Sequence, residues 1–295
     1  MSLVMTVIAG PGAAGALPEL VAALAAALPL AGAPDWLAPG AACDLPLAGA
    51  DWQAAEAAAR QAIGGAAIDV LVQPPRGRRK RVLVADLEST IIENEMLDEL
   101  ADFIGRLSQV AEITRRAMNG ELDFAAALAE RVGLLKGLPA SLLDDAASRI
   151  RLMPGARALV ATLRAAGVRT ALVSGGFTVF AERVAGELGF ERVVANRLEI
   201  ADGRIAGTVR APIVTGETKC DTLLGLAKEC ALSRSATLAV GDGANDAAML
   251  AAAGLGIAFR AKPAVAAAAR WRVDHADLTA LLYAQGYRAG EIVGG

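Results

Sequence analysis

The stretch RVLVADLESTIIENEMLDEL, residues 81–100, is the one around which the rest of the chain is organised. Its apolar run 82–85 predicts a short buried strand. Asp86 and Glu88 follow at once, and open α/β sheets place their ligands at the carboxyl ends of such strands. One carboxylate can act as a nucleophile and bind a cation, while the other donates and accepts protons. The alternative is an acidic turn whose next hydroxyl caps a helix.

Two later strand ends decide against that alternative. The predicted strand 168–173 ends in Ser174-Gly175-Gly176, and the predicted strand 236–240 ends in GDGAND, residues 241–246. Strands and helices alternate along the chain, so we expect a mostly parallel sheet with helices on both faces. The three strand ends then meet at one edge of this sheet.

The side chains at this edge indicate a metal and a phosphate. Asp86, Asp242 and Asp246 would repel one another without a hard cation, and Mg²⁺ suits a few carboxylate oxygens beside a phosphate. Ser174 and the amide of the glycine after it suit phosphate oxygens at a strand-to-helix turn. Lys219, at the start of a predicted helix, can add a positive charge to the same phosphate.

Composition narrows the function classes. The chain has 295 residues, 55% of them hydrophobic, which is enough for one large α/β domain and a smaller one. A net charge of −3 gives no electrostatic case for nucleic acid. The single histidine, His275, makes a Ser-His-Asp triad or a histidine-rich metal site a poor fit.

Localisation is inferred from the cysteines and the N-terminus. The chain has three cysteines and no CxxC, which is typical of a reduced cytosolic protein. The apolar N-terminal stretch has no Lys or Arg before Arg60, and Pro11, Pro18 and Glu19 interrupt it. We therefore expect a strand and an alanine-rich helix there, neither a signal peptide nor a membrane span, and a cytoplasmic protein.

Residues 1–75 predict a small α/β module in a βαβαβ pattern, without a cluster of chemical side chains. It ends in a Pro- and Gly-containing linker at 73–77. The basic run 78–81 that follows is interpreted as a solvated strand entrance, in preference to a nucleic-acid or targeting signal. Residues 76–295 then form the catalytic domain. Within it, about 93–152 predict a mostly helical cap, and caps exclude water from active sites.

The order of motifs resembles the haloacid-dehalogenase (HAD) superfamily, and within it the phosphoserine phosphatases. The motifs are DLEST at 86–90, VSGGFT at 173–178, a lysine at 219 and GDGAND at 241–246; ENEMLDELAD, RAMNGELDF and ERVGLLKGLP are similar to that family's cap segments. The resemblance implies a HAD-like Rossmannoid sheet and Mg²⁺-dependent hydrolysis of O-phospho-L-serine, the last step of serine biosynthesis. It also implies an aspartyl-phosphate intermediate.

The resemblance also implies residue roles. Asp86 is the nucleophile; Glu88 takes the acid/base position and binds the metal through its carbonyl; Asp242 is the other metal ligand. Asp246 and Asn245 support the metal's waters and the substrate. The phosphate contacts are assigned to Ser174, Gly175, Gly176 and Lys219, and the contacts to the rest of the substrate to Glu95, Met118, Phe124 and Arg131. An Arg for the carboxylate and a Glu for the ammonium suit an amino acid.

One departure from the family pattern leaves alternatives open. The family usually carries Asp where this chain has Glu88. Glu at this position also occurs in a related phosphotransferase that uses homoserine, so transfer to an acceptor alcohol is a second hypothesis. A serine-sensing or scaffolding protein with a weakened site is a third. The module 1–75 is then either ACT-like or an aid to folding and pairing, and monomer and homodimer both stay open.

Overall fold

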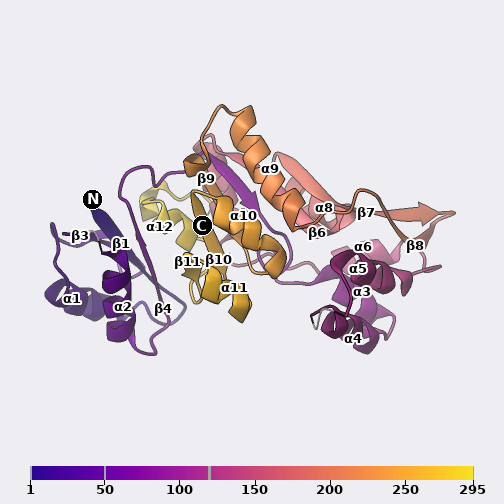
Figure 1. Cartoon of the computed structure of the whole chain (residues 1–295), viewed down its shortest axis with the longest axis horizontal. Helices are drawn as coiled ribbons and strands as arrows, with labels where there is room; N and C mark the ends of the chain where they lie inside the picture. The colour runs from indigo at the N-terminus through magenta and orange to yellow at the C-terminus, as the bar shows by residue number, and fades with distance from the viewer. Residues whose placement is uncertain (1, 50, 119–120, 295) are drawn as a thin grey trace.

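The computed structural model describes residues 2–49, 51–118 and 121–294, with the side chain of Met118 also outside the described part. Figure 1 shows three parts in a row: an N-terminal module, a central sheet domain and a helical cap. The sheet domain lies in the middle, so the module and the cap sit at opposite ends of the molecule. In the described part, no helix is both long and apolar enough to cross a membrane.

The N-terminal module has one strand more than predicted. Its elements are β1 (Leu3–Ala9), α1 (Leu17–Ala27), β2 (Asp35–Ala38), β3 (Ala42–Leu47), α2 (Trp52–Ile63) and β4 (Ile68–Gln73). They form a four-stranded antiparallel sheet in the order β2-β3-β1-β4. The βαβαβ prediction is wrong because 36–47 holds two strands, with a turn at Gly40, whose φ is +71°. Asp51 caps α2, accepting a hydrogen bond from the amide of Ala54 at 3.0 Å.

The central sheet confirms the predicted parallel architecture. Its elements are β5 (Val82–Ala85), α7 (Ala156–Ala165), β6 (Arg169–Phe177), α8 (Thr178–Leu188), β7 (Arg192–Ala201), β8 (Arg204–Arg210), α9 (Gly216–Glu229), β9 (Thr237–Gly241), α10 (Ala247–Ala252), β10 (Leu255–Phe259), α11 (Pro263–Ala268), β11 (Trp271–Val273) and α12 (Ala280–Ala284). The order is β11-β10-β9-β5-β6-β7-β8, parallel except for the antiparallel hairpin β7–β8. No sequence pattern had indicated α11 or β11.

Both faces of this sheet are buried, which is why β5 reads as a continuous apolar run. Leu83 and Ala85 point into one hydrophobic cluster together with α7, α8 and α12. Val82 and Val84 point into the other, with α9, α10 and α11. Successive side chains of a strand point to opposite faces, so a strand in the middle of the sheet needs apolar residues at every position.

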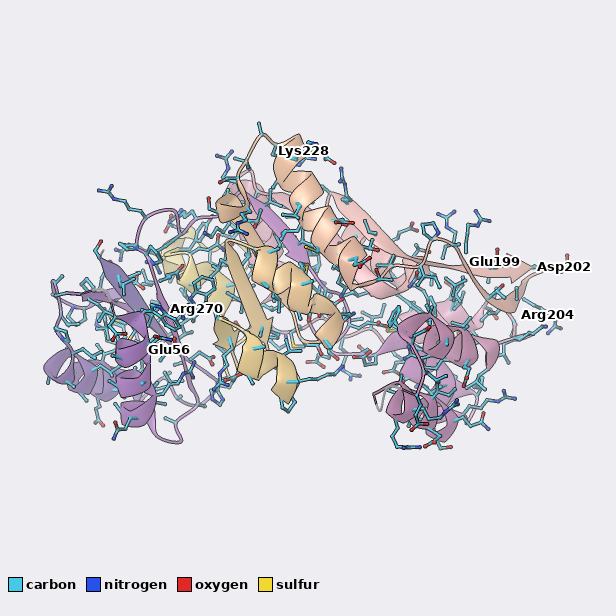
Figure 2. All side chains as sticks on the ribbon, viewed as in Figure 1. Glu56, Glu199, Asp202, Arg204, Lys228 and Arg270 are labelled. Atoms are coloured by element: carbon cyan, nitrogen blue, oxygen red, sulfur yellow. The ribbon has the colours of Figure 1, made fainter. Side chains whose placement is uncertain are left out.

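The cap consists of α3 (Met96–Phe103), α4 (Leu107–Met118), α5 (Phe124–Gly133) and α6 (Leu142–Ala147), as the sequence predicted. The β7–β8 hairpin reaches out from the sheet to meet it (Figure 1). Two cap amides donate to hairpin carbonyls, Gly137 to Ile205 at 2.8 Å and Ala140 to Gly203 at 2.9 Å. Figure 2 shows the hairpin tip at Asp202 and Arg204. The hairpin therefore braces the cap from the side of the sheet domain.

The N-terminal module is joined to the sheet domain through buried polar contacts. The carboxylate of Asp69 accepts hydrogen bonds from the backbone amides of residues 274–276, at 2.7 to 3.3 Å. Arg270 reaches Glu56 of α2 at 3.3 Å, and Figure 2 shows the two side chains meeting at this boundary. The division at 75/76 and the ACT-like interpretation of the module stay predictions.

The interpretation of the basic run as solvated is wrong for two of its four residues. Arg78 donates to Asp44 at 2.5 Å and to the carbonyl of Ala284 at 3.1 Å, so it links the module to α12. Lys80 is only 7% exposed. Sequence patterns do not reveal this burial, because both partners of Arg78 are distant along the chain.

Candidate active site

The three predicted strand ends do meet. The strands β9, β5 and β6 are adjacent and parallel, so the residues after them lie at one edge. A cavity of about 130 Å³ opens there under the cap. Its lining residues are Asp86, Glu88, Glu95, Leu97, Asp98, Phe124, Leu128, Arg131, Gly175, Gly176, Phe177, Asp242, Gly243, Asn245 and Lys262.

Lys219 lies directly beneath this cavity. Its ammonium donates to Asp86 at 2.6 Å and to Asp246 at 2.7 Å, and the residue is fully buried. Burial by itself would lower the pKa of Lys219, but the two carboxylates outweigh it and raise the pKa, so the ammonium stays charged. The predicted lysine therefore sits against the candidate nucleophile.

Asp86, Asp242 and Asp246 each offer an oxygen atom, and the three atoms lie within 4.8 Å of one another. Burial raises the pKa of Asp86 to about 7, with Lys219 opposing and Asp246 adding to the rise. Burial likewise raises the pKa of Asp242 to about 6. The raised pKa values show that the negative charge of these crowded carboxylates is not fully balanced by nearby positive charge. Such a site can hold a hard cation.

Asp246 differs from the other two carboxylates. One of its oxygens accepts from Lys219 and the other accepts from the amide of Gly243 at 3.0 Å. Both oxygens are thus already engaged. This arrangement suits a residue that orients Lys219. The role that the resemblance implied for Asp246, support of the metal's waters, stays a prediction.

The Ser174-Gly175 turn is held by a residue that the sequence analysis did not single out. Asn196, in β7, donates to the carbonyl of Gly175 at 2.7 Å and accepts from the amide of Val214 at 2.8 Å. It is 1% exposed. Asn196 therefore ties the candidate phosphate turn to the segment that leads into α9 and Lys219. The only sign of Asn196 in the sequence is that it is a polar residue within a run of residues typical of a strand.

Glu88 faces the cap. Its carboxylate accepts a hydrogen bond from the amide of Met96, at the start of α3, at 2.8 Å. Gly176 makes room for it, since a Cβ there would lie 2.8 Å from a Glu88 oxygen. Enclosure raises the pKa of the Glu88 carboxyl to about 8, with the charge of Glu95 adding to the rise. A carboxyl group that keeps its proton near neutral pH can act as an acid.

Three of the predicted substrate residues of the cap line the cavity. Phe124 and Arg131 come from α5, and Glu95 immediately precedes α3. In the described part of the chain no carboxylate forms an ion pair with Arg131, whose guanidinium donates only to the carbonyl of Ala127 at 3.2 Å. It is thus available for a carboxylate ligand. The predicted contact from Met118 falls on a side chain outside the described residues.

The cavity also contains lining residues that the sequence analysis missed. They are Leu97, Asp98, Leu128, Phe177, Gly243 and Lys262. Leu97, Asp98 and Leu128 share helices with predicted residues, so helical spacing could have suggested them. Lys262 could not be found in this way, because it follows β10 and approaches Asp242 at 3.7 Å only after the sheet has formed.

Comparisons with known proteins fit this geometry. The model of the haloacid dehalogenase-like hydrolases matches residues 83–251. A phosphoserine phosphatase of Mycobacterium tuberculosis is 47% identical over 215 residues, which cover 73% of this chain and 53% of that protein. The chain therefore spans about half the length of this relative.

Two solved structures are also similar. A HAD family hydrolase from Salmonella enterica serovar Typhi has a TM-score of 0.84 and 29% identity, covering 96% of this chain and 97% of its own. A phospho-aspartyl intermediate analogue of a phosphoserine phosphatase has a TM-score of 0.65 and 37% identity, covering 70% of this chain and 98% of its own. The first match thus includes the N-terminal module as well as the sheet and cap.

Proposed function

This chain belongs to the haloacid dehalogenase-like hydrolases, and from that premise we propose that it hydrolyses O-phospho-L-serine to L-serine and phosphate. The observation that carries the proposal is one cavity with two ends. Asp86 lies at its base with Lys219 directly behind it. Glu95 and Arg131, which has no ion-pair partner within the described residues, line its cap side. The phosphate of phosphoserine fits the base of the cavity, and its amino-acid part fits the cap side. We further propose that the reaction is the last step of serine biosynthesis, in the cytoplasm.

Substrate binding follows from the charges on each side. Arg131 can bind the substrate carboxylate through two parallel hydrogen bonds, and Glu95 can accept from the ammonium. Glu95 is held for this task by Ser89, whose hydroxyl donates to it at 2.7 Å. At the base, the Gly175 amide and Lys219 would contact the phosphate oxygens, and Ser174, whose hydroxyl accepts from the amide of Gly176 at 2.9 Å, would reach them from just outside the cavity lining. The phosphorus is thereby directed toward Asp86.

In the first step, an oxygen of Asp86 attacks phosphorus and the bond from phosphorus to the serine oxygen breaks. Serine oxygen is a poor leaving group, so a proton must arrive as that bond breaks. Glu88 holds such a proton, because enclosure raises its pKa to about 8. The products of this step are serine and an aspartyl-phosphate at residue 86.

In the second step, water attacks the aspartyl-phosphate and Glu88, now ionised, takes a proton from that water. The bond between Asp86 and phosphorus breaks and phosphate leaves. Lys219 stays charged throughout and balances the carboxylate that is formed again. Glu88 thus gives up one proton in the first step and regains one in the second, so its protonation state is restored after each turnover.

We propose Mg²⁺ as the cation of the acidic cluster. The oxygens of Asp86 and Asp242 and the carbonyl of Glu88 would hold it, and hard oxygen donors are what this ion prefers. When bound, it neutralises charge that develops on the phosphoryl oxygens.

The test is phosphate release from phosphoserine by purified protein with Mg²⁺. We expect release well above that of the Asp86→Asn variant, with phosphothreonine and sugar phosphates turned over more slowly. Release equal to that of the variant would refute the proposal.

Phosphotransfer to an acceptor alcohol is a second candidate. The carboxylate of Glu88 lines the cavity and accepts from the amide of Met96 at the start of α3, so it faces the cap side of the cavity, where a second alcohol would have to bind to take up the phosphoryl group. Adding homoserine during turnover would then yield phosphohomoserine, detectable by ³¹P NMR. If phosphate remains the sole phosphorylated product, transfer is excluded and hydrolysis stands.

A further inference from the structure

A second cavity lies at the amino ends of the strands of the central sheet, whereas the active site lies at their carboxyl ends. Its volume is about 340 Å³. It lies where β5, β9, β10 and β11 begin, and the linker after β4 covers it. The lining residues are Gln73, Pro74, Arg76, Gly77, Arg79, Lys80, Ser235, Ala236, Gly254 and Trp271. We call this the linker cavity.

The linker cavity carries an excess of positive charge. Arg76, Arg79 and Lys80 line it, and none of the described lining residues is acidic. Glu291 balances Arg79 alone, at 2.8 Å, and Arg79 also stacks on Tyr287 at 3.9 Å. Arg76 and Lys80 therefore have no counter-charge among the residues that the structure describes.

Lys80 is the less exposed of these two. It is 7% exposed, and its ammonium donates to the carbonyls of Gly77 at 2.8 Å and Ser235 at 2.9 Å. An ammonium carries three N–H groups, so one remains, and within the described residues no carboxylate forms an ion pair with Lys80. Burial lowers the pKa of Lys80. Buried lysines are normally paired, so this one lacks its usual partner.

We propose that the linker cavity is a binding site for a compact oxyanion, namely the phosphate or carboxylate group of a small molecule. Arg76 and Lys80 supply charged donors, which bind such groups more strongly than neutral ones. Trp271 and Pro74 add an apolar wall for the remainder of the ligand. The volume lies at the lower end of the range of roughly 300 to 1,000 Å³ that small-molecule sites occupy.

The position of the site gives it a consequence for stability. Arg76 belongs to the linker between the two parts, while Ser235 and Trp271 belong to the sheet domain. An anion held between them stabilises the folded chain, because it binds there and not to the unfolded chain. Thermal stability should therefore rise with anion concentration.

The experiment uses the full chain, free of metal, with inorganic phosphate as the first probe in calorimetry. The metal-free parent protein should bind phosphate in the linker cavity, because the carboxylates of the active site disfavour an anion when no cation is present. Arg76→Ala should weaken this binding at least about tenfold, since one charged hydrogen bond is lost. Arg81→Ala is the matched control, because Arg81 is exposed, lies five residues after Arg76 in the sequence and does not line the cavity.

Three further measurements complete the test. Phosphoserine turnover should be equal in the parent and in Arg76→Ala, which separates this proposal from the proposed activity. Malonate as a second probe tells the sources apart: binding by both probes indicates any oxyanion, and binding by phosphate alone indicates a phosphate group. Anomalous scattering from selenate in crystals should place a peak beside Lys80.

Equal phosphate binding by Arg76→Ala and Arg81→Ala would overturn the proposal. So would selenate density confined to the active site. Because Arg76 is exposed, its removal does not endanger folding, and either result is decisive.

Discussion

The active-site cavity and the linker cavity lie at the two ends of the same short strand. Lys80 lies two residues before β5 begins and Asp86 follows its end, yet one cavity has an excess of acids and the other of bases. In each, burial moves the pKa toward the neutral form, up to about 7 for Asp86 and downward for Lys80. Holding like charges together costs folding free energy unless a ligand of opposite charge binds. The acidic cavity therefore suits a cation, and the basic cavity suits an anion.

The comparison also shows what makes a cavity catalytic. The active-site cavity lies under the cap, and loops from β5, β6 and β9 converge on it. The linker cavity contains no carboxylate among its described lining residues and lies away from the cap. A nucleophile, a proton carrier and exclusion of water are needed for turnover, whereas charge alone suffices for binding.

The largest expected effect separates the two cavities completely. Asp86→Asn should lower phosphoserine turnover by about 10⁴-fold or more, because the attacking carboxylate is lost. Phosphate binding in the linker cavity should be unchanged. Turnover and calorimetry on the same preparation measure both, and a variant that keeps a tenth of the parent activity would show that Asp86 is not the nucleophile.

Glu88→Gln should have the next largest effect. It should lower phosphoserine turnover by about 10²- to 10⁴-fold, because the serine oxygen leaves without its proton. With p-nitrophenyl phosphate, whose phenolate leaves unaided, the first step should survive and the second should stall. Stopped-flow should then show a burst of p-nitrophenol as the aspartyl-phosphate accumulates.

A control on the same residue distinguishes a role of the side chain from one of the backbone. If only the Glu88 carbonyl matters, through the metal, Glu88→Gln would keep most of its turnover and show no burst. That outcome would remove the acid/base assignment and leave Asp86 and Asp242 as assigned.

Arg131→Lys should have a smaller and more selective effect. We expect a loss of about 10- to 100-fold with phosphoserine, since lysine cannot offer two parallel hydrogen bonds to a carboxylate. Turnover of p-nitrophenyl phosphate, which has no carboxylate, should change little. Equal losses on both substrates would mean that Arg131 supports the cap and does not recognise the substrate.

The smallest effect concerns pH and metal removal. Asp86 and Asp242 have folded-state pKa values of about 7 and about 6, above the unfolded value of 3.8. The folded state therefore binds more protons, so stability is favoured at low pH and lost as pH rises through these values. In metal-free protein we expect a loss between pH 5 and pH 8 of about 3 kcal/mol from Asp86 and about 1 kcal/mol from Asp242, since each pH unit below the folded-state pKa corresponds to about 1.4 kcal/mol.

Denaturant unfolding at several pH values measures this slope. Asp86→Asn should flatten it, and so should Mg²⁺, which favours the ionised ligands. If the slope is the same with and without Mg²⁺, the acidic cluster does not bind the ion. Arg76→Ala, at the other cavity, should leave the slope unchanged and serves as the control.

Much of the fold could be predicted because its periodicity is local. The apolar runs at β5 and β9, the hairpin turn at Asp202 and the four cap helices all follow from neighbouring residues. The division of 36–47 into two strands could not be predicted, since one glycine at positive φ decides it. The short elements α11 and β11 were missed for a similar reason: their patterns are too brief to show a period.

The sequence by itself predicted which residues meet at the candidate active site. Parallel strands all end at one edge, so residues that follow β5, β6 and β9 must converge whatever the details of packing. Only the tertiary structure decided which polar residues hold that site in place. Asn196 bridges Gly175 and Val214, and Lys80 becomes buried, only when segments that are far apart in the chain come into contact. Hydrogen bonds and burial are set by those contacts, and no local pattern encodes them.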